Sequence, residues 1–153
     1  MKFRMFLAAV AARAPAACNP GAQVEDARAQ IDKFHALYGA GDAKGFREAS
    51  GAEFRKVVTE EQVQGLMTLF AKRLGKIEST KQTGFNTGFN NGTTTTTIVM
   101  QTRFERGEAT ETYVFTGSGK DMVLLNWNVT SPLLELSPKD MKKLTEETGE
   151  AVG

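Results

Sequence analysis

The sequence predicts an α+β fold in which N-terminal helices pack on a four-stranded antiparallel sheet. Up to residue 75, apolar residues recur at helical spacing, and from Lys76 onward apolar and polar residues alternate. Three turn-like segments divide the alternating half into strands that can pair in chain order. With these turns, the larger apolar residues fall mainly on one face, as expected for an antiparallel sheet that covers a core on one side.

Two long helices are expected in the first half of the chain. The first has its apolar residues on one stripe and ends at Gly39 and Gly41. That stripe consists of Val24, Ala27, Ile31, Phe34 and Tyr38. Asp42 is placed to cap a short helix. Thr59 and Gln62 fit a capping box for the second long helix, which Gly75 ends.

The register of the sheet follows from its turns. Asn91-Gly92 suits a type I′ hairpin, because both central positions of that turn need a positive φ. With further loops at 106–107 and 117–121, Phe85 is expected opposite Ile98, Ile98 opposite Phe115, and Phe115 opposite Val123. The predicted apolar face carries Phe85, Phe89, Ile98, Met100, Phe104, Tyr113, Phe115, Val123, Leu125, Trp127 and Val129.

Composition limits the class of protein. A chain of 153 residues suits one domain with an N-terminal appendage. Its 19 basic and 18 acidic side chains are interleaved, so no basic patch for nucleic acid is expected. We divide the chain into a signal peptide with a lipobox-like end (1–18), an α+β domain (19–136) and a polar C-terminal helix or tail (137–153).

The first 18 residues have the layout of a secretory signal. Lys2 and Arg4 precede a short apolar run over 5–12, and small residues lead to Cys18. The junction resembles a bacterial lipobox, which implies lipidation of Cys18 and a lipoprotein exported across the inner membrane to face the periplasm. An ordinary secretory signal with an incidental cysteine, or a wrongly assigned start codon, are the alternatives.

Catalytic motifs are not recognisable in the sequence. A Ser-His-Asp or Cys-His site needs a histidine, and the chain has only His35, which is expected to be a surface or partly packed helical residue. No metal-ligand motif or phosphate-binding loop is present, so we predict no catalytic residue, metal or cofactor.

One polar group of residues falls on the otherwise apolar face. The expected register places Lys81 opposite Thr102, Thr102 opposite Glu111, and Glu111 opposite Trp127, with Tyr113 beside them. Lys81 and Glu111 could form a salt bridge at the wet margin of the sheet. Alternatively, Lys81, Thr102, Glu111, Tyr113 and Trp127 could form a ligand-binding patch at the mouth of an apolar cavity.

Residues from about Ile31 to Leu134 resemble small bacterial secreted or lipoprotein domains of unknown function in the nuclear-transport-factor-2-like superfamily. The segments that carry the resemblance are 38–42, 54–59, 74–77, 104–112 and 124–131. The resemblance implies a cystatin-like cone, with the helices packed on a curved sheet. Enzymes of the superfamily place His, Asp or Tyr within the cone, where this chain offers Glu111 and Tyr113.

These observations lead to two functional hypotheses. The first is an envelope-anchored, non-enzymatic binding or interaction domain whose partner is an apolar small molecule or an envelope protein, attached to the membrane only through its lipid. The alternative is a small cofactor-free isomerase or lyase with Glu111 as the base and Tyr113 as a hydrogen-bond donor. A homodimer through the Thr-rich outer face of the sheet, common in the superfamily, is compatible with both.

Overall fold

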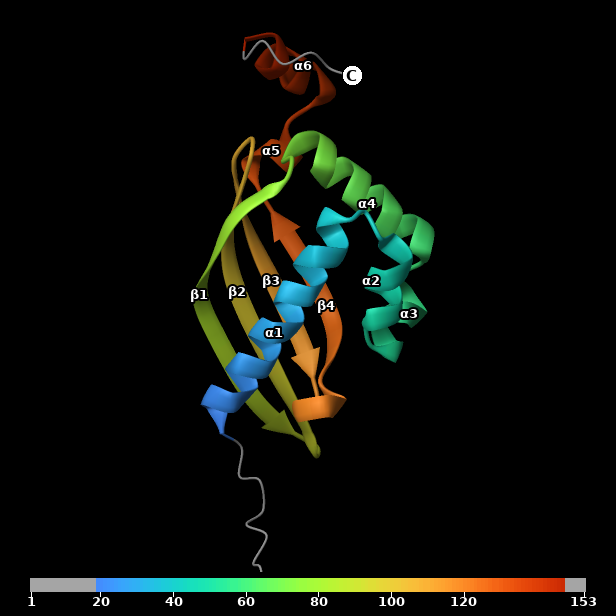
Figure 1. Cartoon of the computed structure of the whole chain (residues 1–153), viewed down its shortest axis with the longest axis vertical. Coiled ribbons are helices and arrows are strands. Elements are labelled where there is room, and N and C mark those ends of the chain that lie inside the picture. The colour runs from blue at the N-terminus through green and yellow to red at the C-terminus, as the bar shows by residue number, and fades with distance from the viewer. Residues whose placement is uncertain (1–18, 148–153) are drawn as a thin grey trace, which may run out of the picture.

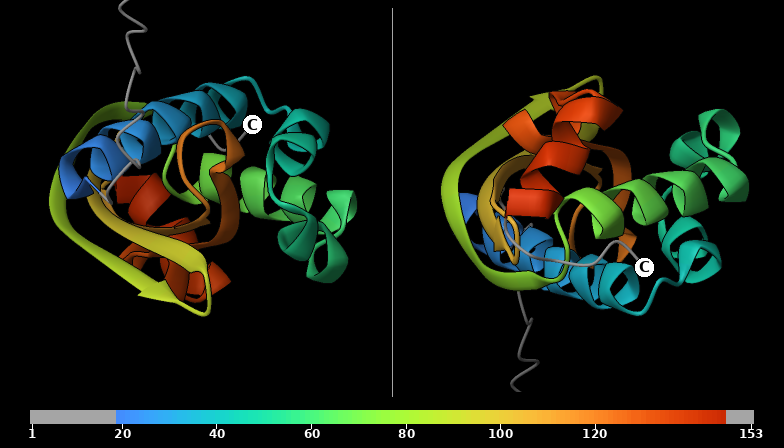
Figure 2. Two further views of the ribbon diagram at one scale, coloured as in Figure 1. Left: turned by 90° about the horizontal axis from the view of Figure 1, so that it is seen from below. Right: turned by 90° about the horizontal axis from the view of Figure 1, so that it is seen from above.

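A computed structural model describes residues 19–147 and confirms the predicted α+β cone (Figure 1). Its four antiparallel strands pair in chain order. They are β1 (Ile77–Asn90), β2 (Thr93–Phe104), β3 (Glu108–Thr116) and β4 (Val123–Thr130). Helix α1 (Pro20–Gly39) lies along the inner face of the sheet, which curves around it (Figure 2). This curvature gives the cone its interior.

Three further helices follow α1, and side-chain caps set where most of them begin. These helices are α2 (Ala43–Ala49), α3 (Ala52–Val57) and α4 (Glu60–Arg73). Asp42 accepts a hydrogen bond from the Gly45 amide at the start of α2, and both halves of the predicted capping box form at Thr59 and Gln62. The sequence analysis did not predict α3, whose six residues are too few to show a helical period.

The remaining elements are short. A 3-10 turn, η1 (Gly119–Asp121), joins β3 to β4. After β4, α5 (Pro132–Glu135) and α6 (Pro138–Glu147) each begin with proline, which suits the first helical turn. Arg73 at the end of α4 donates from Nη1 to the carbonyls of Leu133, Leu134 and Leu136, at 3.1, 2.9 and 2.7 Å. These bonds hold α5 against α4.

The core lies between the inner face of the sheet and the apolar stripes of the helices. Five side chains of the predicted apolar face are buried: Ile98, Met100, Phe104, Tyr113 and Phe115. They pack in one cluster with residues of the helices, including Ile31, Phe34, Phe46, Val63 and Phe70. Trp127 and Val129 are partly buried against the same cluster. The prediction that these strands share one buried face is therefore confirmed for the middle of the sheet.

The first hairpin follows the predicted register near its turn and departs from it further along. Asn91 and Gly92 have φ values of 49° and 77°, and Phe85 lies opposite Ile98 as expected. A bulge between Gln82 and Gly84 then places Gln82, rather than Thr83, opposite Met100. Residues 79–82 of β1 therefore face the opposite side from the prediction, until a second bulge between Ile77 and Ser79 returns Ile77 to the inner side.

The other two hairpins also differ from the predicted register. Ile98 lies opposite Tyr113 rather than Phe115, a shift of two residues that keeps each side chain on its predicted face. In the last hairpin, Val114 pairs with Asn126 and Phe115 with Leu124, so Leu125 is the extra residue of a bulge. The predicted inward positions of Val123 and Leu125 are therefore wrong, and Leu124 is buried instead.

Two residues of the predicted core face are not covered. Phe85 and Phe89 are 57% and 67% exposed, although the pairing of Phe85 with Ile98 places it on the inner side of the sheet. The tip of the β1–β2 hairpin extends beyond the start of α1 (Figure 1). Within residues 19–147, no helix covers this tip and buries these rings.

The bulge in β4 predicts opposite effects for two adjacent residues. Leu124→Ala is expected to lower the free energy of unfolding by about 2–5 kcal/mol, because Leu124 is fully buried and its loss leaves a cavity. Val123→Ala is expected to cost less than about 1 kcal/mol, since Val123 is 37% exposed. Urea denaturation of both variants measures the difference. Equal losses, or a larger loss for Val123→Ala, would contradict this register.

Candidate functional site

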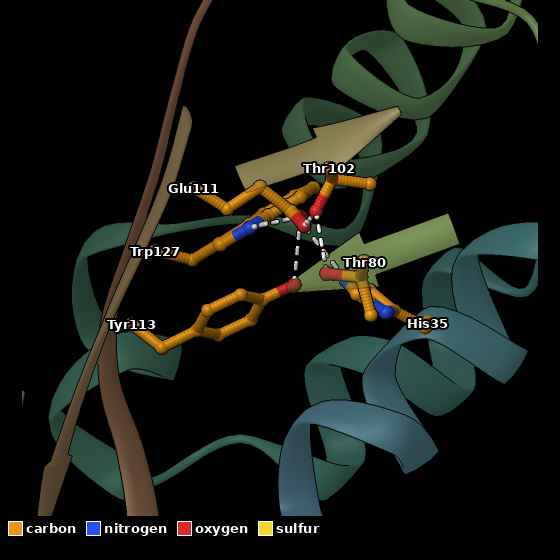
Figure 3. Close-up of polar contacts among 6 residues, drawn as sticks. All are labelled: His35, Thr80, Thr102, Glu111, Tyr113 and Trp127. Atoms are coloured by element: carbon orange, nitrogen blue, oxygen red, sulfur yellow. Dashed lines mark hydrogen bonds and ion pairs between the residues drawn. The ribbon is translucent and has the colours of Figure 1, made fainter. Parts of the chain in front are cut away.

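Glu111 is a buried carboxylate at the centre of β3. Its side chain points to the inner face of the sheet, and the residue is 1% exposed. A carboxylate removed from water costs several kcal/mol unless its oxygens accept hydrogen bonds. The groups around Glu111 supply these bonds (Figure 3).

Four side chains donate hydrogen bonds to this carboxylate, two to each oxygen. Oε2 accepts from Thr102 Oγ1 at 2.5 Å and from His35 Nε2 at 2.7 Å. Oε1 accepts from Tyr113 Oη at 2.8 Å and from Trp127 Nε1 at 3.3 Å. A carboxylate has about four lone-pair positions, so this arrangement occupies all of them.

A second layer of contacts fixes the donors. The hydroxyls of Thr80 and Thr102 lie 2.9 Å apart, and Thr102 uses its one proton on Glu111, so Thr80 is the donor of this pair. The rings of Tyr113 and Trp127 stack with centroids 6.2 Å apart, and His35 meets Tyr113 edge-on at 6.0 Å. These contacts hold the donors in the orientations that Glu111 requires.

The surroundings of Glu111 favour its ionised form. Burial alone would raise the pKa of this carboxyl, but the hydrogen bond and charge of His35, with the hydrogen bonds of Thr102 and Tyr113, lower it below its ordinary value of 4.5. In turn, burial, followed by the negative charge of Glu111 and the hydrogen bond between the two side chains, raises the pKa of the Tyr113 phenol well above 10. Tyr113 therefore keeps its proton at neutral pH and donates a hydrogen bond to Glu111.

The structure brings together four of the five residues predicted to bind a ligand. Thr102, Glu111, Tyr113 and Trp127 are in direct contact, whereas Lys81 is exposed and pairs with Gln101. The predicted pairing of Lys81 with Thr102 and Glu111 is wrong because the bulge between Gln82 and Gly84 shifts β1 by one residue. Glu111 was also expected opposite Thr102 and Trp127, but it lies opposite Met100 and Val129, two residues away on the same face, and reaches Thr102 and Trp127 diagonally. Thr80 takes the position opposite Thr102.

His35 is the residue that the sequence analysis missed. It was expected to be isolated, yet its Nε2 atom lies 2.7 Å from Glu111 and its side chain is only 12% exposed. A usable signal was present, because His35 follows Ile31 by one helical turn and borders the apolar stripe of α1. An inward-facing carboxylate also needs a donor from the covering helix.

A cleft lined in part by His35 lies next to this hydrogen-bond network. Its volume is about 660 Å³, and it lies between the second half of α1, the end of α4, the start of β1 and the β2–β3 turn. Ala36, Ala71 and Ile77 provide apolar wall, and His35, Lys76, Glu105 and Arg106 provide polar groups. Tyr38 also lines it and donates to the Gly75 carbonyl at 3.1 Å. Burial, then the charges of Glu111 and Glu105, raises the pKa of Tyr38 to about 12.

The two ring nitrogens of His35 differ in their contacts. Its Nε2 atom must carry a proton, because the ionised carboxylate of Glu111 can only accept. Its Nδ1 atom makes no hydrogen bond to any residue between 19 and 147 and is not among their fully enclosed polar atoms. Nδ1 can therefore accept a proton or hydrogen bond when the ring is neutral and donate one when the ring is protonated. Glu111 itself has no oxygen lone pair left for a ligand.

Metal binding has no support in the described part of the chain. Between residues 19 and 147, no three His, Cys, Asp or Glu side chains lie close enough to hold a metal ion. The helices of this region include none that is both long and apolar enough to cross a bilayer. Cys18, the predicted lipidation site, lies outside the described residues.

The buried carboxylate predicts how stability depends on pH. Because the folded-state pKa of Glu111 is lowered, its stabilising effect is complete above about pH 4.5 and decreases as the pH falls below that value. Glu111→Gln places an amide N–H₂ against hydrogen-bond donors, and we expect a loss of about 3 kcal/mol in the free energy of unfolding at pH 7. The gap between wild type and Glu111→Gln should narrow below pH 4.5 in urea denaturation.

Glu108→Gln is the matched control, since Glu108 lies on the same strand and is exposed. We expect it to change stability by less than about 0.5 kcal/mol at any pH. A gap between wild type and Glu111→Gln that stays constant from pH 7 to pH 3 would contradict a lowered pKa.

Comparisons with known proteins leave the family open. No family model and no curated protein matches the chain. Among solved structures, Bd1075 of Bdellovibrio bacteriovorus is similar at 7% identity and a TM-score of 0.45. The match covers 69% of this chain but only 40% of the Bd1075 chain. A putative isomerase from Bacillus subtilis is similar at 12% identity and a TM-score of 0.37, over 84% of this chain and 96% of that one.

Proposed function

We propose that this protein is a non-enzymatic binding domain whose cleft beside His35 holds a small amphipathic molecule. The observation that carries the proposal is the position of His35, which lines the cleft and has one ring nitrogen fixed by a buried carboxylate while the other makes no hydrogen bond within the described chain. A binding site needs a few polar groups held rigidly within mostly apolar walls. The cleft volume of about 660 Å³ also falls within the usual range for small-molecule sites.

The charges around the cleft favour a ligand with an acidic group. Lys76 and Arg106 contribute two cations and Glu105 one carboxylate, and the backbone amide of Lys76 donates to Glu105 Oε1 at 3.1 Å. The second ring nitrogen of His35 can add a donor when the ring is protonated. A carboxylate of the ligand would pair with His35 and this cationic excess. Its apolar part would lie against Ala36, Ala71 and Ile77.

Hexanoate is a suitable probe for this cleft, with ligand-observed NMR as the measurement at pH 6. We expect saturable binding that weakens about ten-fold in His35→Gln, the equivalent of one hydrogen bond. Hexanamide, which lacks the charge, should bind more weakly than hexanoate. Equal binding of hexanoate by wild type and His35→Gln would contradict the proposed role of this histidine.

A second pair of variants tests the cleft without altering the contacts of Glu111. A Cβ atom added at Gly39, in the cleft wall, meets no atom within 4 Å, so Gly39→Leu places a side chain into the cleft and should abolish binding. Gly65 on α4 is also helical and has equally open space around its added Cβ atom, but it lies outside the cleft lining. Gly65→Leu should bind hexanoate as wild type does.

Acid–base chemistry is the second candidate function, and the His35–Glu111 contact favours it. A carboxylate that orients a histidine is a common arrangement for a general base. Our earlier hypothesis used Glu111 as the base of an isomerase or lyase, but its lone pairs are occupied and its pKa is lowered. Nδ1 of His35 is better placed to remove a proton from a molecule in the cleft.

Proton exchange separates binding from this chemistry. Levulinate carries a carboxylate and a ketone, and a base beside it would replace its acidic C–H protons with deuterium in D₂O. Catalysis by His35 should raise the exchange rate by about 10²-fold or more over His35→Gln, a typical contribution of a positioned base. Binding without faster exchange would support the non-enzymatic function and reject the isomerase.

We also propose that the domain belongs to the nuclear-transport-factor-2-like superfamily and is attached to the cell envelope by a lipid on Cys18. The cone fold supports the proposed superfamily, and the layout of the first 18 residues supports export and lipid attachment. Cys18 directly precedes Asn19, whose side chain caps α1 through the Gly21 amide at 3.1 Å. A lipid at Cys18 would therefore be joined almost directly to the folded domain.

A further inference from the structure

The β1–β2 hairpin carries an exposed aromatic pair in a long segment without charge. Phe85 and Phe89 are 57% and 67% exposed, while most other Phe side chains of the described chain are buried. No Asp, Glu, Lys or Arg occurs between Gln82 and Thr102, although charged residues make up 24% of the sequence. Exposed apolar residues with no charge beside them are typical of a contact surface.

This aromatic pair lies at the end of the molecule where the described chain begins. Arg28 Nη1 on α1 donates to Gln82 Oε1 on β1 at 3.1 Å, which fixes the two elements beside each other. From this contact, α1 runs back about 14 Å to Asn19, at ~1.5 Å per residue. The strand runs about 23 Å to Phe89, at ~3.3 Å per residue. Both segments run toward the same end of the cone (Figure 1).

We propose that this end of the cone rests on the lipid bilayer, with Phe85 and Phe89 inserted at the membrane interface. The proposal depends on the lipid anchor at Cys18. Because α1 starts at Pro20, the described chain contains no flexible linker between Asn19 and the domain. A lipid on the residue before Asn19 would hold this end, and therefore the hairpin, close to the headgroups.

The chemistry of the hairpin suits an interface better than it suits water. Phe rings that enter the headgroup region leave water, and the Asn and Thr side chains between them can hydrogen-bond to headgroups and water. Insertion of the tip desolvates no charge, because its strands carry none between Gln82 and Thr102. The adjoining turn η1 carries Lys120 and Asp121, whose charges offset each other.

The test uses the acylated full-length protein, purified from a bacterial host and reconstituted in phosphatidylcholine vesicles. Mass spectrometry of the mature chain first reports whether Cys18 carries acyl chains. An acylated Cys18 has no free thiol, and the sequence holds no other cysteine, so Asn90→Cys at the hairpin is the only site for a nitrobenzoxadiazole label. We expect the label emission to shift to shorter wavelength in vesicles, as it does on leaving water.

Two control variants separate insertion from proximity. Glu135→Cys places the same label at an exposed position of α5, at the opposite end of the sheet, and should keep the emission of a label in water (Figure 1). Phe85→Ser with Phe89→Ser in the Asn90→Cys protein should lose most of the shift while the protein stays on the vesicles. Both phenylalanines are exposed, so these changes should leave the fold intact.

Each remaining outcome overturns the proposal in a recognisable way. An acylated protein whose Asn90 label emits as in water would reject the hairpin contact and leave the anchor standing. A mature chain without acyl groups would reject the anchor and, with it, this inference, but not ligand binding in the cleft. A shift that depends on the number of protein copies per vesicle would instead assign Phe85 and Phe89 to a contact between copies.

Discussion

The carboxylate of Glu111 connects every layer of the cone. Its four hydrogen-bond donors come from α1, β2, β3 and β4, and Thr80 of β1 joins through Thr102. A buried charge is tolerated only when all its lone pairs are satisfied, so the charge penalises any arrangement in which one element is displaced. A one-residue slip of β4, for example, would turn Trp127 away. The interaction therefore selects one register among several that the apolar pattern would accept.

The same interaction divides the chemical roles in the site. Glu111 is fully occupied by protein donors and is shielded from ligands, so its function is to hold its neighbours in place. As a result the ring of His35, which lines the cleft, is fixed through one nitrogen, while the other makes no hydrogen bond within residues 19–147. Such an arrangement serves a ligand-binding histidine and a catalytic base equally well.

The cone has two different ends. The cleft lies near the second half of α1 and the β2–β3 turn, where Lys76, Glu105 and Arg106 bring charge. The hairpin tip lies near the start of α1 and carries Phe85 and Phe89 without charge. An anchor at the start of α1 would therefore leave the cleft facing away from the membrane and open to the surrounding solution. Binding and attachment would use separate parts of one small domain.

The sequence by itself determined the elements and the shared apolar face, because helical and alternating periods are local properties that turn residues delimit. The caps at Asp42 and Thr59, the Asn91-Gly92 turn and the burial of Tyr113 all follow from them. The sequence also grouped Thr102, Glu111, Tyr113 and Trp127 on the inner face, and tertiary structure decided the rest of the site. The bulge at Thr83 turned Lys81 to the outer face of the sheet, and the bulge at Leu125 turned Leu124 to the inner face. Helix α1 brought His35 to Glu111, 76 residues further along the sequence. Bulges and helix placement minimise the energy of the whole core, so no local pattern encodes them.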